Sequence, residues 1–362
     1  MQKIVCFHIV NDFSGSTKML AVTLDGILQR GIKVDLITSR GGILDALQNE
    51  NLRTFHFPYS HSKNKLLAGF DYLFSQFFIF FFAFKYVFAK NTTFYINTIK
   101  PVGATFAGKI IRKKIVYHYH ENAFAVSSFY RILCKIMQIF ADKIICVSQY
   151  QRNFLSRQKN VFIIPNALPK SFENAFGIDV KNNFEQKRVL LFSNLRFFKG
   201  MLEFIELAKR QPQFNFELVI GEKQDDIQRF FDKHKINFPE NLTLTARQSD
   251  VIPLYQRASL LLNLSNKEFV VETFGLTALE AMTAGLPVIV PTVGGIAEVV
   301  EDGVTGYKID VQELDKIEQQ INIILSDFEL YKTLSYNALK TAKNFDCDIT
   351  NEKILQIILN KE

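Results

Sequence analysis

Short apolar runs alternate with longer helix-like stretches along most of the 362 residues. The chain opens with an apolar run at 4–10, continues with a helical pattern at 16–30, and returns to an apolar run at 34–38 after Gly31. Strands that are joined in this way by helices form parallel sheets. The chain is long enough, and at 48% hydrophobic residues apolar enough, to bury two cores. The sequence therefore predicts an α/β protein with two domains.

The alternating segments fall into two series. In the first domain, 1–168, further strands are expected at 93–97, 114–118 and 143–147, and a last apolar run ends at Pro165. A polar stretch that reaches Lys187 contains the linker. In the second domain, 169–344, strands are expected at 189–193, 216–220, 242–245, 260–263 and 288–290. A final helix at 349–359, within the segment of about 345–362, could return to the first domain.

Several classes of protein are disfavoured by what the sequence lacks. The loop at 11–16 has no GxGxxG motif, which disfavours NAD binding. The opening apolar run is too short for the apolar region of a signal peptide, so we expect a cytoplasmic protein. The cysteines show neither CxxC spacing nor a dense framework, so neither structural disulfides nor a zinc site is expected. These cysteines are Cys6, Cys134, Cys146 and Cys347.

Positive charge is concentrated in the first half of the chain. Residues 1–170 contain 22 Lys and Arg against 8 Asp and Glu, whereas residues 171–362 contain 21 against 28, so the halves carry +14 and −7. Such asymmetry indicates an anionic partner for the first half, either a membrane surface or a nucleic acid. No nucleic-acid-binding motif follows in the sequence. We therefore expect an anionic membrane surface and no nucleic acid.

The segment 66–88 contains nine phenylalanines. Its longest unbroken apolar stretch, 77–84, is much shorter than the ~20 residues of a membrane-spanning helix. Two interpretations remain: a helix of the protein core, or an aromatic helix in the membrane interface with nearby lysines against lipid phosphates. The basic surroundings favour the second. It predicts a peripheral protein on the inner face of the cytoplasmic membrane.

The pattern with the clearest chemical meaning runs from Glu272 to Pro287, with the sequence Glu-Thr-Phe-Gly-Leu-Thr-Ala-Leu-Glu-Ala-Met-Thr-Ala-Gly-Leu-Pro. Glu272 follows the expected strand at 260–263, and a helix that begins near Leu276 carries Glu280. The first-turn N–H groups of a helix have no helical acceptor and bind anions. A loop of this kind lies at the carboxyl edge of a parallel sheet, where ligands bind.

A sugar nucleotide suits this order of groups. It presents hydroxyls at both ends and a diphosphate between them, so it needs carboxylates on either side of N–H donors. Glu272, the amides of Gly275–Thr277 and Glu280 supply that order. Two merely solvated glutamates are the alternative, which the Gly-Leu-Pro and Gly-Gly that follow at fixed offsets disfavour. The sequence therefore predicts a nucleotide-sugar donor site.

This stretch resembles the signature of glycosyltransferase family 4, whose members are retaining enzymes of GT-B architecture. The resemblance is strong from about 189 to 309, and it implies two Rossmann-like, doubly wound domains facing across a cleft. It also implies that Glu272 binds the hydroxyls of the donor sugar and Glu280 the ribose. The amides expected to bind the phosphate and sugar are those of Phe274, Gly275, Leu276 and Thr277.

A second element of the same family lies at 191–200. Many members carry Gly-Arg-Leu and then, four residues after the leucine, Lys-Gly. Here Lys199 and the following glycine match, Asn194 takes the place of the arginine, and Arg196 is placed to supply the missing charge. A lysine and an arginine beside a helix start can neutralise a leaving diphosphate. We therefore assign all three residues to the donor site.

The first domain carries weaker family features. His120-Glu121 ends an expected strand and resembles a His-acidic pair of the family, which implies that His120 touches the donor sugar near the reacting carbon. A single histidine at a strand end can also be structural. Gly15 corresponds to a family loop that approaches the phosphates or the acceptor. The expected catalytic residues are thus Glu272, His120 and Lys199.

The predicted activity is transfer of a sugar, with retention, from a nucleoside diphosphate sugar to a hydroxyl of a membrane-associated or lipid-linked glycan. Such a reaction belongs to the synthesis of cell-surface polysaccharide, capsule or lipopolysaccharide. Neither Asp225-Asp226 nor the pair Asp346 and Asp348 has the partner ligands that a hard cation needs, so no metal or other cofactor is expected. The alternatives are a non-catalytic sugar-nucleotide-binding protein and an epimerase or phosphorylase of the same fold.

Overall fold

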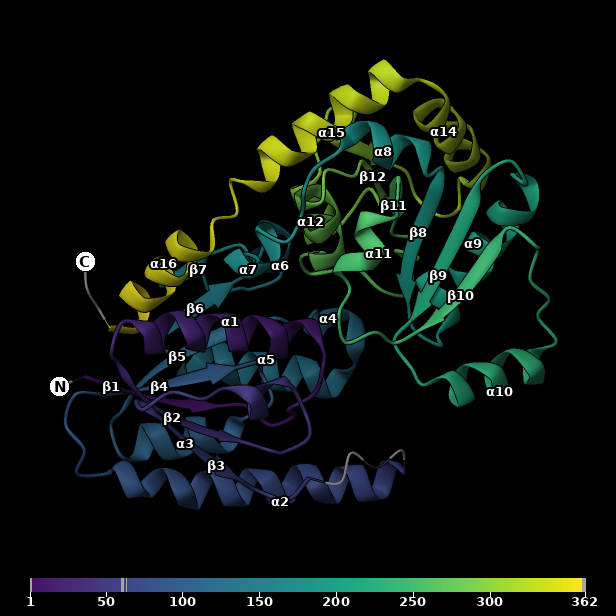
Figure 1. Ribbon diagram of the computed structural model, residues 1–362. Coiled ribbons are helices and arrows are strands. Elements are labelled where there is room, and N and C mark those ends of the chain that lie inside the picture. The colour runs from purple at the N-terminus through teal and green to yellow at the C-terminus, as the bar shows by residue number, and fades with distance from the viewer. Residues whose placement is uncertain (1, 60–61, 63, 360–362) are drawn as a thin grey trace. The chain divides into compact units, whose positions relative to one another are not determined.

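The structure is a computed structural model that describes residues 2–59, 62 and 64–359 (Figure 1). The chain divides into two compact units. The first contains Met1–Ala167 together with Cys347–Glu362, and the second is Leu168–Asp346. The division falls one residue from the boundary expected at 168, and the last helix is part of the first unit.

The first unit is built on a seven-stranded sheet in which every neighbouring pair is parallel. The strand order is β3-β2-β1-β4-β5-β6-β7, a Rossmann order extended by one strand. The topology reverses between β1 and β4, where Ile4 lies opposite Val34 on one side and Thr93 on the other. The strands are β1 Lys3–Phe7, β2 Lys33–Thr38, β3 Leu52–His56, β4 Thr92–Asn97, β5 Lys114–Tyr119, β6 Lys143–Cys146 and β7 Val161–Ile163.

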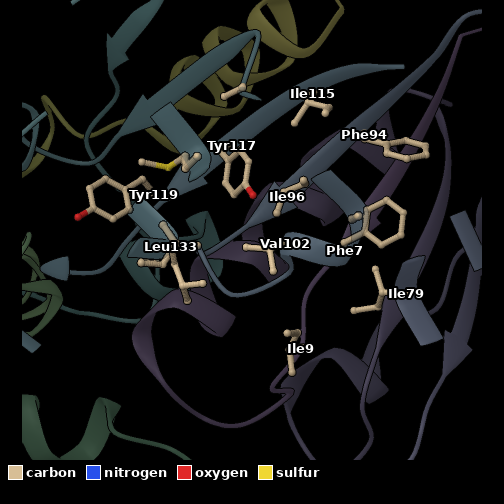
Figure 2. Packing of buried hydrophobic residues seen from close by; sticks show 14 of the residues in the cluster. Phe7, Ile9, Ile79, Phe94, Ile96, Val102, Ile115, Tyr117, Tyr119 and Leu133 are labelled. Atoms are coloured by element: carbon tan, nitrogen blue, oxygen red, sulfur yellow. The ribbon is translucent and has the colours of Figure 1, made fainter. Parts of the chain in front are cut away.

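Helices cover both faces of this sheet (Figure 1). Helices α1 and α16 pack on one face, and α2, α3 and α5 pack on the other, each over its own hydrophobic cluster. In the second cluster Phe7 meets Phe94 edge to face, with ring centroids 5.0 Å apart, beside Ile79 of α2 (Figure 2). The helices are α1 Gly15–Gln29, η1 Ile43–Ala46, α2 Lys65–Ala83, η2 Phe84–Tyr86, α3 Val102–Ile110, α4 Ala123–Val126, α5 Ser128–Phe140, α6 Gln149–Asn153 and α16 Cys347–Leu359.

The phenylalanine-rich segment forms α2 and has two different faces. Ser75, Ile79 and Ala83 are fully buried, and a Cβ added to Gly103 of α3 would lie 2.3 Å from the Gln76 carbonyl oxygen, so the two helices touch closely. The core interpretation is therefore right for this face. Within the described residues, Leu66–Tyr86 is the single helical stretch that is long and apolar enough to cross a membrane, a test that buried core helices also pass.

The opposite face of α2 is exposed and continues over its neighbours. We call the exposed apolar side chains of α2, α3 and α5, together with Val87 and Phe88 just after η2, the outer helical face. It holds more than half of the exposed large hydrophobic side chains in the described part of the chain. Its members are Leu66, Leu67, Phe70, Leu73, Phe74, Phe77 and Phe81 on α2, Val87 and Phe88 just after η2, Phe106 and Ile110 on α3, and Phe129, Ile132 and Ile139 on α5.

The second unit repeats the plan with six parallel strands. Their order is β10-β9-β8-β11-β12-β13, and the topology reverses between β8 and β11. The strands are β8 Arg188–Ser193, β9 Asn215–Ile220, β10 Leu242–Ala246, β11 Leu260–Leu262, β12 Val288–Val290 and β13 Gly306–Lys308. The helices are α7 Lys170–Glu173, α8 Val180–Glu185, η3 Phe197–Lys199, α9 Met201–Arg210, α10 Gln224–His234, α11 Ile252–Gln256, α12 Leu276–Thr283, α13 Gly295–Val299, α14 Leu314–Ser326 and α15 Phe328–Ala342.

The predicted α/β fold with two doubly wound sheets is confirmed. Two strands were not expected from the sequence, β3 and β13. β3 is an edge strand whose residues are half-buried or exposed, and β13 has only three residues, so neither shows a strong apolar run. In both sheets the loops after the two central strands begin at the point where ligands bind in open α/β folds.

Candidate active site

Two loops at the carboxyl edge of the second sheet bring three polar side chains together. The loop after β8 carries Lys199, and the loop after β11 carries Ser265 and Glu272. The Lys199 ammonium forms an ion pair with Glu272 Oε1, and its Nζ lies 3.5 Å from Ser265 Oγ. The Ser265 hydroxyl donates to the same carboxylate oxygen at 3.1 Å. Lys199 and Glu272, 73 residues apart in the chain, therefore form one cluster at the topological switch point.

Glu272 is held in its ionised form. Burial by itself would raise the pKa of this carboxyl, but the charge of Lys199 and hydrogen bonds from Lys199, Ser265 and Asn263 lower that pKa below its usual value. The side chain of Glu272 keeps 26% of its exposure, so the carboxylate remains open to a ligand. It can thus accept hydrogen bonds from hydroxyl groups.

Two glycines fix the backbone of these loops. Gly200 has φ +76°, and a Cβ there would lie 2.4 Å from the carbonyl oxygen of Leu264. Gly275 has φ +90°, and its Cβ would lie 2.4 Å from the side chain of Ile296. Because L side chains rarely adopt such angles and neither site has room for one, both positions require glycine. The close approach at Gly200 sets Lys199 beside the loop after β11.

Helix α12 provides a second part of the site. Its first turn has no side-chain cap, so the amides of Leu276 and Thr277 have no acceptor inside the helix and are suited to an anion. Phe274 turns its ring into the core against Phe345, with ring centroids 5.8 Å apart, so only its backbone suits ligand contact. Glu280 is buried and accepts a hydrogen bond from the Tyr255 hydroxyl at 2.6 Å. Tyr255 therefore fixes this carboxylate.

Asn194 and Arg196 follow β8 and differ in their surroundings. The Oδ1 atom of Asn194 is buried and has no hydrogen-bond partner among the described residues, which suits a ligand donor. Arg196 is exposed, and its guanidinium carbon lies 5.8 Å from the centre of the Phe198 ring. In the part of the chain that the structure describes, no ion pair joins Arg196 to Glu272.

A chain of buried polar side chains lies at the carboxyl edge of the first sheet. Nε2 of His120, after β5, lies 3.0 Å from Asn97 Oδ1 at the end of β4. Nδ2 of Asn97 lies 3.1 Å from Nδ1 of His8, whose Nε2 lies 3.2 Å from the Thr17 hydroxyl. Thr17 in turn donates to Asp12 at 2.8 Å. The side-chain amide of Asn97 thus assigns the tautomers of both histidine rings. Its oxygen accepts from His120 Nε2–H, and its nitrogen donates to His8 Nδ1.

These histidines are neutral. Burial lowers the pKa of His120 well below its usual value, and the neighbouring His118 and His8 add to this effect. The ring of His118 lies 4.1 Å from that of His120 and bonds the Tyr95 hydroxyl at 2.7 Å through Nδ1. Glu121 is turned away, since its carboxylate accepts from the Ile99 amide at 3.1 Å. The same carboxylate also accepts from the backbone N–H of His120 at 3.3 Å, and the expected contact of His120 with the donor sugar stays a prediction.

The first unit also contains a pocket at the carboxyl edge of its sheet, with a volume of about 740 Å³. Its walls follow β2 and β3 and include the start of α2, and they mix aromatic rings with charged groups. The lining residues are Arg40, His56, Phe57, Pro58, Tyr59, Phe70, Asp71 and Phe74. Gly15 lies at the exposed start of α1, and its contact with a ligand stays a prediction.

Across residues 2–59, 62 and 64–359, no group of three or more His, Cys, Asp or Glu side chains could hold a metal ion. Asp226 pairs instead with Arg229 at 2.7 Å. The four cysteines are free thiols in buried positions.

The two Rossmann-like sheets give the chain the architecture of GT-B glycosyltransferases, the fold that its structural neighbours share. Residues 176–341, inside the second unit, match the family model for group 1 glycosyl transferases. The site cluster of Lys199, Ser265 and Glu272 lies within this range. The matched domain and the glycosyltransferase relatives described below support a transferase enzyme.

The chain is also similar in sequence to named glycosyltransferases and in fold to solved structures. The chain is 27% identical over 255 residues to an uncharacterized glycosyltransferase of Methanocaldococcus jannaschii, covering 67% of each chain. It is 24% identical to N,N'-diacetylbacillosaminyl-diphospho-undecaprenol alpha-1,3-N-acetylgalactosaminyltransferase of Campylobacter jejuni, over 65% of this chain and 63% of that one. The crystal structure of HepE from Anabaena in complex with UDP and glucose matches all of both chains with a TM-score of 0.79 at 22% identity, which shows the shared fold. The alignments thus span about two thirds of the length of these two relatives.

Proposed function

We propose that the chain is a retaining glycosyltransferase of family 4 that moves a sugar from a nucleoside diphosphate sugar to a hydroxyl of a membrane-associated or lipid-linked glycan. The observation that carries the proposal is the cluster of Lys199, Ser265 and Glu272 at the switch point of the second sheet. The complex of HepE with UDP and glucose, a protein of the same fold, is consistent with such a donor.

The donor fits the second unit group by group. Glu272, ionised and half-buried, accepts hydrogen bonds from the hydroxyls of the sugar. Lys199, with its ammonium against that carboxylate, is placed to serve a diphosphate oxygen as well. The first-turn amides of α12 add neutral donors for the phosphates. Glu280, fixed by Tyr255, accepts from the ribose hydroxyls.

The first unit supplies the acceptor side and one group near the reacting carbon. His120 has a neutral ring whose Nε2–H is bound to Asn97, and the family resemblance implies that this ring touches the donor sugar. The pocket of about 740 Å³ suits the acceptor, because Arg40 and His56 can bind hydroxyl or phosphate groups beside aromatic rings. The exposed apolar start of α2 borders this pocket, as a lipid-linked acceptor requires.

Transfer makes one bond and breaks one at the same sugar carbon. The bond from C1 to the diphosphate oxygen breaks, and the acceptor oxygen bonds to C1 on the same face, so that the configuration is retained. The proton of the acceptor hydroxyl passes to an oxygen of the departing diphosphate. Lys199, the α12 amides and Arg196 stabilise the charge that develops on that group, so the reaction needs no metal ion.

The proposed site of action is the inner face of the cytoplasmic membrane, in the synthesis of cell-surface polysaccharide, capsule or lipopolysaccharide. The +14 charge of residues 1–170 and the outer helical face support this location. A positively charged first half is attracted to anionic lipid, and its acceptor pocket then lies in the unit that meets the membrane.

Replacing Glu272 tests the donor site. Glu272→Gln should lower turnover by about two orders of magnitude or more. The neutral amide of glutamine cannot form the ion pair with Lys199, and it is a weaker acceptor than a carboxylate for the hydroxyls of the sugar. Glu268→Gln is the matched control, since Glu268 is an exposed carboxylate of the same loop and should give wild-type rates. Donor turnover is followed as release of nucleoside diphosphate. A folded Glu272→Gln variant with wild-type turnover would remove the assignment.

A further inference from the structure

The hydrogen-bonded side chains at the carboxyl edge of the first sheet form one continuous chain, which we call the buried polar chain. Its members, in order, are His120, Asn97, His8, Thr17 and Asp12. They come from the ends of β5, β4 and β1 and from the first turn of α1 and the loop before it. Because the topology reverses between β1 and β4, the chain spans the point where ligands bind in open α/β folds. The proposed function assigns no role to its last three members.

Every hydrogen bond in this chain points in the same direction. Nδ2 of Asn97 lies 3.4 Å from the Ser16 carbonyl oxygen, and a carbonyl oxygen can only accept. This contact fixes the orientation of the amide, so the Asn97 oxygen faces His120 and accepts from it. His8 accepts from the amide nitrogen through Nδ1, so its own proton lies on Nε2 and is donated to Thr17. All donors therefore point away from His120.

The chain ends on a negative charge. Burial alone would raise the pKa of Asp12, but hydrogen bonds from Ser14 and Thr17 lower that pKa below its usual value. Oδ1 of Asp12 accepts from the backbone N–H of Ser14 at 2.9 Å and from its hydroxyl at 2.6 Å. Burial lowers the pKa of His8 to about 4, so this ring is neutral and keeps a single tautomer between Asn97 and Thr17. A fixed carboxylate at one end thus sets the direction of every donor before it.

The amide in the middle of the chain limits what the chain can do. A side-chain amide donates and accepts hydrogen bonds but does not exchange its protons for those of a neighbour, so Asn97 cannot pass a proton from His120 to His8. Asn97, His8 and Thr17 are also buried, which keeps them from touching a ligand. A buried network whose members are all hydrogen-bonded fixes one arrangement of its side chains. The chain therefore orients the His120 ring and does not conduct protons.

We propose that Asn97, His8 and Thr17 are positioning residues for glycosyl transfer, which hold the His120 ring in one orientation and in its Nε2–H tautomer. The proposal rests on the proposed function, in which His120 lies at the donor sugar near the reacting carbon. Misplacement of such a group acts on the chemical step. Because the positioning residues do not touch the donor, breaking the chain should lower kcat and leave the KM for the donor near its wild-type value.

Thr17→Val tests the chain at a point remote from His120. Valine has the shape of threonine but lacks the hydroxyl that joins His8 to Asp12. The variant should lower kcat for donor turnover about tenfold, with the KM for the donor within about twofold of wild type. The matched control is Thr38→Val, because Thr38 is fully buried at the end of β2 and its Oγ1 has no hydrogen-bond partner among the described residues. Folded Thr17→Val and Thr38→Val proteins with equal kcat would overturn the proposal.

Asn97→Asp tests the middle of the chain. It keeps an acceptor for His120 but replaces the donor to His8 by a second acceptor, so that two lone pairs would face each other across the present 3.1 Å. A folded variant should lose at least as much kcat as Thr17→Val, and wild-type kcat would overturn the proposal.

The tautomers of the wild-type protein provide a measurement that needs neither a variant nor a substrate. Nitrogen NMR of the imidazole rings should find the proton of His120 on Nε2 and that of His8 on Nε2. A proton on Nδ1 of either neutral ring would overturn the chain. Absence of donor turnover in the wild-type protein would instead refute the proposed function, so the two failures are distinguishable.

Discussion

Removing the Lys199 ammonium perturbs the candidate donor site at its centre. In Lys199→Ala, Glu272 keeps its hydrogen bond from Ser265 but loses its only ion-pair partner among the described residues. Burial then acts on the carboxyl without the opposing charge of Lys199, so the pKa of Glu272 should rise from its wild-type value. The variant therefore loses a cation for the diphosphate and at the same time weakens the charge of the carboxylate that holds the sugar.

The size of the effect follows from burial and contact. Opposite charges in contact are worth roughly 4 kcal/mol at an effective dielectric constant of about 20. The side chains of Lys199 and Glu272 are 20% and 26% exposed, so screening by solvent reduces this figure. Loss of one preorganised hydrogen-bond donor in an active site typically lowers kcat by about 10² to 10³. We expect a loss in this range for Lys199→Ala, with Lys209→Ala, an exposed cation of α9, near the wild-type rate.

The pH dependence of kcat/KM should also differ between the wild type and Lys199→Ala. In the wild type the folded pKa of Glu272 is lowered, so its contribution to stability is present above the unfolded pKa and is lost as pH falls through the folded pKa. In Lys199→Ala the acid limb of kcat/KM should move to higher pH, because Glu272 then takes up a proton earlier. The assay is nucleoside diphosphate release across pH for both proteins. A folded variant with a wild-type rate and an unmoved acid limb would refute the reasoning.

Three further predictions concern the glycine, the histidines and the metal. Gly200→Ala should lower the free energy of unfolding by at least about 2 kcal/mol, whereas Gly177→Ala, in open space, should not; equal thermal unfolding of the two would contradict the close packing. Burial lowers the pKa values of His8 and His118 in the folded protein to about 4 and about 3, so the unfolded chain takes up these protons first as the pH falls. Each of the two histidines should therefore lower the free energy of unfolding, measured by urea denaturation, by about 2 kcal/mol between pH 7 and pH 5. A free energy of unfolding that does not change over this range would argue against neutral buried rings. Donor turnover should survive EDTA, and loss of activity that Mg²⁺ or Mn²⁺ restores would overturn the metal-free mechanism.

The sheets could be predicted because their strands are buried on both faces. β1 and β8 each contain a continuous run of four apolar residues, as strands of a covered parallel sheet do. β3 gave no such signal because it lies at the sheet edge, and three-residue β13 is too short for a pattern. The two faces of α2 were also not predictable from the sequence, since seven phenylalanines lie along this helix and only tertiary packing distinguishes buried Ile79 from exposed Phe81.

The candidate site was predictable where the residues lie close together in a motif. Glu272 and Glu280 fall in one stretch, and Lys199 follows a recognisable strand. Ser265, Tyr255 and Asn97 were missed, because each acts through a hydrogen bond to a residue distant in the chain or in a separate element. A lone serine, tyrosine or asparagine has no spacing signal. Its role becomes visible only when the fold places strand ends side by side.

The most direct test of the proposed function is release of nucleoside diphosphate from a panel of sugar nucleotides, with and without a lipid-linked acceptor, by wild-type protein and Glu272→Gln. The proposal predicts acceptor-dependent release with at least one donor, an NMR spectrum of the first-formed glycoside in which an α donor gives an α linkage, and a loss of about two orders of magnitude in the variant. Absence of release from every donor, or release that Glu272→Gln leaves unchanged, would contradict it.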